Sequence, residues 1–231
     1  MNLATMKFHS ESLHRHVSYS VILPEKQTGP APVLMMLHGY SDDHSAWINM
    51  SNLVRHAREY PFIIVLPDGG ISFYLNANGA MMYEDFLMQD LYGHVNATFQ
   101  TRPGRWAIGG LSMGGYGSMR LACKYPERFA SVWAHSSAFF RLEEMPWLPE
   151  EQADADIYAI TAGLASSQVR PVISFDCGTE DFLIEQNRRM HTHLEQAGVA
   201  HRYVEHPGAH TWEYWDEHVR EALRQHAEVL L

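Results

Sequence analysis

Apolar and polar positions alternate over residues 16–23, which predicts a strand with one buried face. Residues 33–37 and 62–66 are instead uninterrupted apolar runs, which are typical of strands buried on both faces of a sheet. The complete set of predicted strands is 16–23, 33–37, 62–66, 105–110, 129–135, 172–177 and 201–206.

Between these strands the apolar positions recur at the spacing of one helix face. The clearest case is 84–99, where apolar side chains stand at positions 87, 91, 95 and 99. Helices are predicted at 46–60, 84–99, 113–125, 185–196 and 213–230. Because strands alternate with helices, we expect an α/β fold with a mostly parallel central sheet and helices on both faces.

No linker or internal repeat interrupts this pattern, so residues 1–231 are expected to form a single domain. The least regular stretch is 138–170, which contains an acidic patch between Glu150 and Asp156. We interpret this stretch as a short excursion above the sheet and not as a second domain.

The composition narrows the classes of function. Hydrophobic residues make up 46% of the chain, which is typical of a globular protein, and the net charge of −10 makes it a poor general binder of nucleic-acid phosphates. No apolar run approaches a membrane span, and the N-terminus does not resemble a signal peptide, so we expect a cytoplasmic protein without membrane contact. No metal or cofactor motif is evident, and the pattern is compatible with a homo-oligomer.

The strongest chemical signal is the sequence Gly110-Leu-Ser112-Met-Gly114, a G-x-S-x-G motif between a predicted strand and a predicted helix. Glycines two residues on either side of the serine allow a sharp turn, which lifts the hydroxyl of Ser112 clear of the sheet. The next backbone N–H, that of Met113, lies at a helix N-terminus, where partial positive charge favours an oxyanion. This context predicts a nucleophilic serine.

A nucleophilic serine needs a histidine base and an acid that orients the base. Asp176, Glu180 and Asp181 lie at the end of a predicted strand, and Asp181 is favoured because it stands in the loop beyond that strand. Asp176 lies within the strand and is interpreted as a structural residue. The histidine candidates are His201, His206 and His210, of which His210 follows a turn that can carry its imidazole toward Ser112.

A second oxyanion donor is expected in the loop after the strand at 33–37. His38, Gly39 and Tyr40 stand there, and Gly39 allows the backbone to turn so that the N–H of Tyr40 points into the site. Four aromatic residues are candidates either for a substrate pocket or for the core: Trp47, Tyr74, Trp147 and Trp212.

Taken together, these motifs resemble the esterase D-type branch of the α/β-hydrolases, which includes tributyrin-type carboxylesterases and S-formylglutathione hydrolases. The resemblance runs from about residue 7 to the C-terminus, and the matching segments are 37–40 with Trp47, 67–70, 109–117, 125–129, 176–183 and 208–215. It implies the α/β-hydrolase fold, with Ser112 as nucleophile, Asp181 as acid and His210 as base. By the same resemblance, the N–H groups of Tyr40 and Met113 are the oxyanion donors.

We therefore expect a cofactor-independent serine carboxylesterase that acts on small short-chain acyl esters. Two alternatives keep the same three residues: a thioesterase similar to S-formylglutathione hydrolase, and an acyltransferase that passes the acyl group to an alcohol. A third alternative is a binding module that has lost catalysis, which a fluorophosphonate labelling test would distinguish from an enzyme. The segment between 139 and 171 looks shorter than in the family, which leaves substrate choice open.

Overall fold

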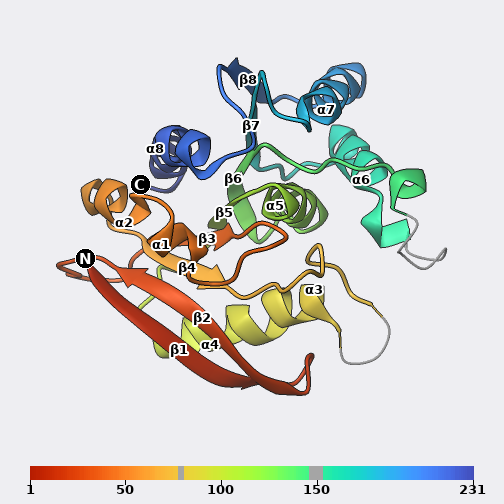
Figure 1. The fold of residues 1–231 in the computed structure, drawn as a ribbon. Helices are drawn as coiled ribbons and strands as arrows, with labels where there is room; N and C mark the ends of the chain where they lie inside the picture. The colour runs from red at the N-terminus through yellow and green to blue at the C-terminus, as the bar shows by residue number, and fades with distance from the viewer. Residues whose placement is uncertain (78–80, 146–152) are drawn as a thin grey trace.

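The computed structural model describes residues 1–77, 81–145 and 153–231. Its centre is an eight-stranded sheet in the order β1-β2-β4-β3-β5-β6-β7-β8 (Figure 1). The strands are β1 (Asn2–Ser10), β2 (Arg15–Leu23), β3 (Val33–Leu37), β4 (Ile63–Pro67), β5 (Trp106–Leu111), β6 (Phe129–His135), β7 (Val172–Gly178) and β8 (Arg202–His206). β1 pairs with β2 and β2 with β4 in antiparallel fashion, and the remaining pairs are parallel. The expected α/β architecture with a mostly parallel sheet is confirmed.

Helices cover both faces of this sheet (Figure 1). The principal helical segments are α1 (Ala46–Asn49), α2 (Leu53–His56), α3 (Tyr83–Asp85), the π-helical segment η2 (Phe86–Leu91), α4 (Tyr92–Thr98), α5 (Met113–Lys124), α6 (Ile157–Gly163), α7 (Ile184–Gln196) and α8 (Trp212–Leu230). Side chains alternate across each strand, so Met35 packs with the cluster under α5, whereas Leu34 and Met36 pack with the cluster under α1, α2 and α8.

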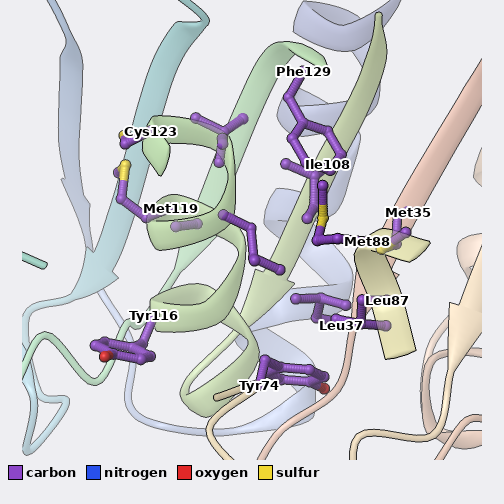
Figure 2. Packing of buried hydrophobic residues seen from close by; sticks show 14 of the residues in the cluster. Met35, Leu37, Tyr74, Leu87, Met88, Ile108, Tyr116, Met119, Cys123 and Phe129 are labelled. Carbon is purple, nitrogen blue, oxygen red and sulfur yellow. The ribbon is translucent and has the colours of Figure 1, made fainter. Parts of the chain in front are cut away.

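Helix α5 lies against β5 and β6 in the middle of the sheet, and buried hydrophobic side chains fill the space around it (Figure 2). Its side chains Tyr116, Met119 and Cys123 are buried in the same cluster as Ile108 of β5 and Phe129 of β6. Because buried interiors are close-packed, this contact holds the β5–α5 junction firmly in place. The site described below is built on that junction.

Two features of the pattern were interpreted wrongly. The N-terminal strand β1 was not predicted. It is an edge strand, and its hydrophobic contacts with the core come from three partly buried side chains, Ala4, Met6 and Phe8, so its apolar pattern is weak. The expected helix at 46–60 is instead split into α1, α2 and a 3-10 turn. Its interruption is held by Asp216 of α8, which accepts hydrogen bonds from the backbone N–H of Asn52 at 2.6 Å and from its side chain at 2.7 Å.

The expected helix at 84–99 forms as one run from α3 through η2 to α4. Within the excursion at 138–170, the described residues form α6 and three short 3-10 turns, and α6 was not predicted. Asp156 caps α6 by accepting hydrogen bonds from the N–H groups of Tyr158 and Ala159. Among the described residues, no helix has both the length and the apolar character needed to span a membrane.

Candidate active site

Ser112 stands at a strained turn between β5 and α5. Its φ is 54°, which lies in the left-handed region. This conformation is unfavourable for any residue that has a side chain. The flanking glycines make this turn sterically feasible: a Cβ on Gly110 would lie 2.5 Å from the carbonyl oxygen of Gly114, and a Cβ on Gly114 would lie 2.5 Å from that of Leu37. The G-x-S-x-G motif thus has the strand–turn–helix geometry expected from the sequence.

Backbone hydrogen bonds fix Ser112 from three neighbouring segments. Its N–H donates to the carbonyl of His135 at 3.0 Å, and its carbonyl accepts from the N–H groups of Tyr116 and Ala138, each at 3.1 Å. These bonds offset the strain of the turn and join it to the end of β6. The hydroxyl of Ser112 is therefore carried on a rigid support, as a reacting group requires.

Asp181 and His210 meet across the ends of β7 and β8. The Nδ1 atom of His210 lies 2.8 Å from Oδ2 of Asp181, and Oδ1 of Asp181 accepts the N–H of Leu183 at 2.8 Å. Asp181 is 2% exposed, so it stands in a low-dielectric setting where a hydrogen bond to the imidazole is strong. When Nδ1 of His210 donates its proton to this hydrogen bond, Nε2 carries no proton and can accept one.

Ser112 and His210 line the same cavity, whose volume is about 530 Å³. Among the described residues, no hydrogen bond joins these two side chains, an arrangement common where substrate binding tightens the geometry. The rest of the lining consists of the loop after β3, nearby apolar side chains and the start of α8: Gly39, Tyr40, Ser41, Asp42, Met50, Leu111, Phe182, Thr211, Trp212, Glu213 and Trp215.

The loop after β3 lies directly against Ser112. A Cβ on Gly39 would stand 3.8 Å from the Cβ of Ser112 and 2.8 Å from Cδ1 of Leu111, so a larger residue at 39 would push the side chain of Leu111 aside. The N–H groups of Tyr40 and Met113 donate to no other group in the described parts of the chain. Tyr40 lines the cavity, and Met113 directly follows Ser112, which also lines it.

His38 braces this loop, a role that the sequence interpretation missed. Its imidazole is 1% exposed, with Nδ1 2.7 Å from the carbonyl of Gly39 and Nε2 accepting the N–H of Gly69 at 2.8 Å. Burial lowers the pKa of His38, which favours the neutral ring that can donate through one nitrogen and accept through the other. The hydroxyl of Tyr74 donates to the carbonyl of His38 at 2.9 Å.

Asp176 lies one layer below the site and does not line the cavity. It is fully buried, accepts hydrogen bonds from Trp133 and Tyr214, and has Nδ1 of His135 2.7 Å from its Oδ2. Burial alone would raise the pKa of Asp176, but attraction to His135 and these hydrogen bonds bring it below the usual value. The structure therefore brings Asp181 to His210 and places Asp176 in a separate buried network.

The aromatic candidates for the pocket divide between cavity and core. Trp212 lines the cavity. Trp47 is 1% exposed and donates through Nε1 to the carbonyl of Leu37 at 3.0 Å, and Tyr74 is fully buried, so both belong to the core. Trp147 lies outside the described residues.

Several residues of the cavity were not predicted, among them Met50, Phe182 and Trp215. Phe182 is 75% exposed, an unusual setting for a large apolar side chain, and its ring lies 4.6 Å from that of His210. Its position next to Asp181 was a signal that could have identified it. Among the described residues, the cluster of histidine and carboxylate groups close enough to share a metal ion lies elsewhere, at the end of β8.

Comparison with known proteins identifies the family of the chain. The Esterase family model matches residues 10–226. An acetyl esterase from Caldicellulosiruptor saccharolyticus is 26% identical over 265 residues, which cover 99% of this chain and 99% of that protein.

Two solved structures from Staphylococcus aureus are similar over almost their whole length. FphF, a fluorophosphonate-binding serine hydrolase, is 25% identical with a TM-score of 0.89, covering 98% of this chain and 98% of its own. The S-formylglutathione hydrolase FrmB is 25% identical with a TM-score of 0.88, covering 98% of this chain and 100% of its own. The chain belongs to the esterase family, and it is a serine ester hydrolase with the α/β-hydrolase fold.

Proposed function

We propose that this protein is a carboxylesterase that hydrolyses short-chain acyl esters through an acyl-enzyme on Ser112. The observation that carries the proposal is the 2.8 Å contact between His210 and the buried Asp181, on the same cavity as the hydroxyl of Ser112. Nucleophile, base and orienting acid are thus all present, in the chain order typical of this fold.

The reaction follows from the positions of these groups. Nε2 of His210 takes the proton of Ser112 as the serine oxygen attacks the ester carbonyl, and Asp181 stabilises the imidazolium that forms. The N–H groups of Tyr40 and Met113 hold the negative oxygen of the tetrahedral intermediate. His210 then protonates the departing alcohol, and it activates a water molecule that releases the acid and frees Ser112.

The lining of the cavity supports small and uncharged esters. Tyr40, Met50, Phe182 and Trp212 supply apolar surface around Ser112, whereas Asp42 and Glu213 bring negative charge. The Trp212 ring packs edge to face against Trp47 at 5.2 Å and therefore forms a rigid wall. The similarity to an acetyl esterase is in keeping with a short acyl group.

A second candidate is a thioesterase acting on S-formylglutathione, because the similar FrmB structure carries that name. Glutathione is anionic at neutral pH, yet the described residues that line the cavity include Asp42 and Glu213 and neither lysine nor arginine. These two carboxylates would repel an anionic substrate in a partly desolvated site. We therefore favour an uncharged ester as the substrate.

The decisive experiment is a comparison of kcat/KM for nitrophenyl esters with two to twelve acyl carbons and for S-formylglutathione. We expect a maximum at two to four carbons and at least a tenfold decrease by eight, since about 1.4 kcal/mol of crowding is sufficient for that. An optimum at eight carbons or more, or a preference for S-formylglutathione, would overturn the proposed substrate class. An added alcohol that outcompetes water for the acyl group would instead indicate an acyltransferase.

The role of Ser112 is tested separately by a fluorophosphonate probe. We expect one adduct per chain in the parent protein and none in Ser112→Ala, with both proteins folded. A parent protein that remains unlabelled, or a variant that is labelled equally, would contradict the acyl-enzyme mechanism whatever the substrate is.

A further inference from the structure

A second cluster of reactive side chains lies at the end of β8, apart from the cavity that contains Ser112. His206 closes β8, and His218 and Glu221 stand on α8, which packs against the sheet beside it. One ligand atom from each of these three residues lies within 4.8 Å of the others. Two imidazoles with a carboxylate are a donor set that Zn²⁺ and related divalent cations prefer in proteins.

The distances in this cluster suit a tetrahedral ion. Oε1 of Glu221 lies 3.4 Å from Nε2 of His206 and 3.7 Å from Nδ1 of His218. Metal–ligand bonds of 2.0–2.1 Å give tetrahedral ligand–ligand edges of about 3.3–3.4 Å, close to these two distances. Because the two imidazole rings are stacked with an interplanar angle of 10°, one ring has to turn before both nitrogen lone pairs point at one ion. Three protein donors leave a fourth position for water.

One nitrogen of the cluster lacks a well-formed hydrogen bond. Nε2 of His206 is buried, and its contact with Oε1 of Glu221 at 3.4 Å does not have hydrogen-bond geometry, so an ion at this position would satisfy it. Its ring stacks on that of His218 at a centroid distance of 3.9 Å and an interplanar angle of 10°.

The other oxygen of Glu221 has a separate partner. Oε2 accepts a hydrogen bond from Arg202 at 2.8 Å, which orients the carboxylate and directs Oε1 toward the two histidines. Such outer contacts are typical of ligands that are held ready for a metal. Glu221 and Arg202 also line a groove of about 540 Å³ beside α8, which gives an ion a path from solvent.

We propose that His206, His218 and Glu221 form a binding site for a divalent transition-metal ion, with Zn²⁺ as the representative. The ion would join the end of β8 to α8. These two elements flank the loop 207–211 that carries His210, so the bound ion would hold both ends of that loop together.

The test is calorimetric titration of ZnCl₂ into protein that has been treated with a chelator and desalted. We expect one ion per chain, with the Kd raised at least tenfold in His218→Ala and in Glu221→Gln. The matched control is His191→Ala. Nδ1 of His191 is already hydrogen-bonded to His201 at 2.8 Å, so this variant should bind as the parent does.

Thermal unfolding gives an independent measurement, because an ion that binds only the folded state stabilises it. At a free Zn²⁺ concentration of about a hundred times Kd, we expect the Tm of the parent and of His191→Ala to rise by about 5 °C or more. Glu221→Gln is close in size to the parent residue and carries the test if His218→Ala does not fold. Absence of binding at 1 mM Zn²⁺, unchanged binding in both cluster variants, or equal loss in His191→Ala would overturn the proposal.

Discussion

The imidazole of His38 joins the loop after β3 to the loop after β4, because its Nε2 accepts the N–H of Gly69 at 2.8 Å while its Nδ1 faces the carbonyl of Gly39 at 2.7 Å. The N–H of Tyr40, one of the two proposed oxyanion donors, therefore depends on a side chain that never touches substrate. His38 is a positioning residue in this arrangement.

His38→Ala should lower both activity and stability. The substitution leaves the N–H of Gly69 without a partner, whereas the carbonyl of Gly39 keeps the N–H of Asp42 at 3.3 Å. We expect it to cost about 1–3 kcal/mol of unfolding free energy. Loss of one oriented oxyanion donor should decrease kcat on the order of 10²-fold with a smaller change in KM. The measurements are urea unfolding and steady-state kinetics on an acetate ester.

The control for this variant is His44→Ala, in the same loop, where the imidazole is hydrogen-bonded to the side chain of Ser20 at 2.8 Å. Its kcat should stay within about twofold of the parent. If His38→Ala is destabilised but keeps the parent's kcat, the positioning role is wrong and His38 is only structural.

Asp181→Asn and Asp176→Asn should separate activity from stability. An asparagine at 181 can no longer hold the Nδ1 proton of His210, so kcat should decrease on the order of 10⁴-fold with little change in unfolding free energy. An asparagine at 176 would face His135, Trp133 and Tyr214 without a charge. Breaking the buried pair with His135 should lower the unfolding free energy by about 3–5 kcal/mol.

Both variants should be assayed where each is more than nine-tenths folded, as judged by circular dichroism. In that comparison Asp176→Asn should keep kcat within about tenfold of the parent. A larger loss of kcat in Asp176→Asn than in Asp181→Asn would show that the orienting acid has been assigned to the wrong residue.

The local backbone geometry at Ser112 could be predicted from the sequence. Ser112 stands in a five-residue motif. Its two glycines are required because a Cβ at either position would collide with the neighbouring backbone. Strands β3 and β6 were placed with their observed bounds, and β3 is a continuous apolar run of the kind that is typical of strands buried on both faces.

The parts that were missed depend on residues distant in the chain. The break between α1 and α2 needs Asp216, which is 164 residues from Asn52, and the role of His38 needs Gly69, 31 residues away. An aromatic pattern alone does not tell a cavity wall from a core, so Trp47 and Trp212 looked equivalent although only Trp212 lines the cavity. Such distinctions are made by tertiary contacts.

Stability should decrease as the pH falls below about 6.5, and His226 should account for part of this decrease. Burial is the main cause that lowers the pKa of His226 from 6.5 to about 3. Its folded pKa lies below its unfolded pKa, so between these values the unfolded chain binds a proton that the folded chain does not. Stability is therefore complete above pH 6.5 and is lost on acidification, on the order of 2 kcal/mol from this group by pH 5.

His226→Gln removes that titration and should flatten the dependence of unfolding free energy on pH between 6.5 and 5. The measurement is urea unfolding at several pH values, with the exposed His16→Gln as control. We expect the control to keep the parent's slope. A slope in His226→Gln as steep as the parent's would mean that His226 is protonated in the folded state over this range.

Phe182 should contribute to substrate binding and not to the chemical steps. Its ring is 75% exposed and lies 4.6 Å from that of His210, at the edge of the cavity, so it gains little from folding and can bury apolar surface only against a ligand. For an ester with an aromatic alcohol, Phe182→Ala should raise KM about five- to tenfold, which corresponds to about 1–1.4 kcal/mol of lost ring contact, and leave kcat within twofold. The unfolding free energy should change by less than about 0.5 kcal/mol. Leu3→Ala, at a 51% exposed position on the edge strand β1, is the matched control and should change neither constant. If Phe182→Ala instead lowers kcat and keeps KM, the ring holds the imidazole of His210 in place and its role belongs to catalysis.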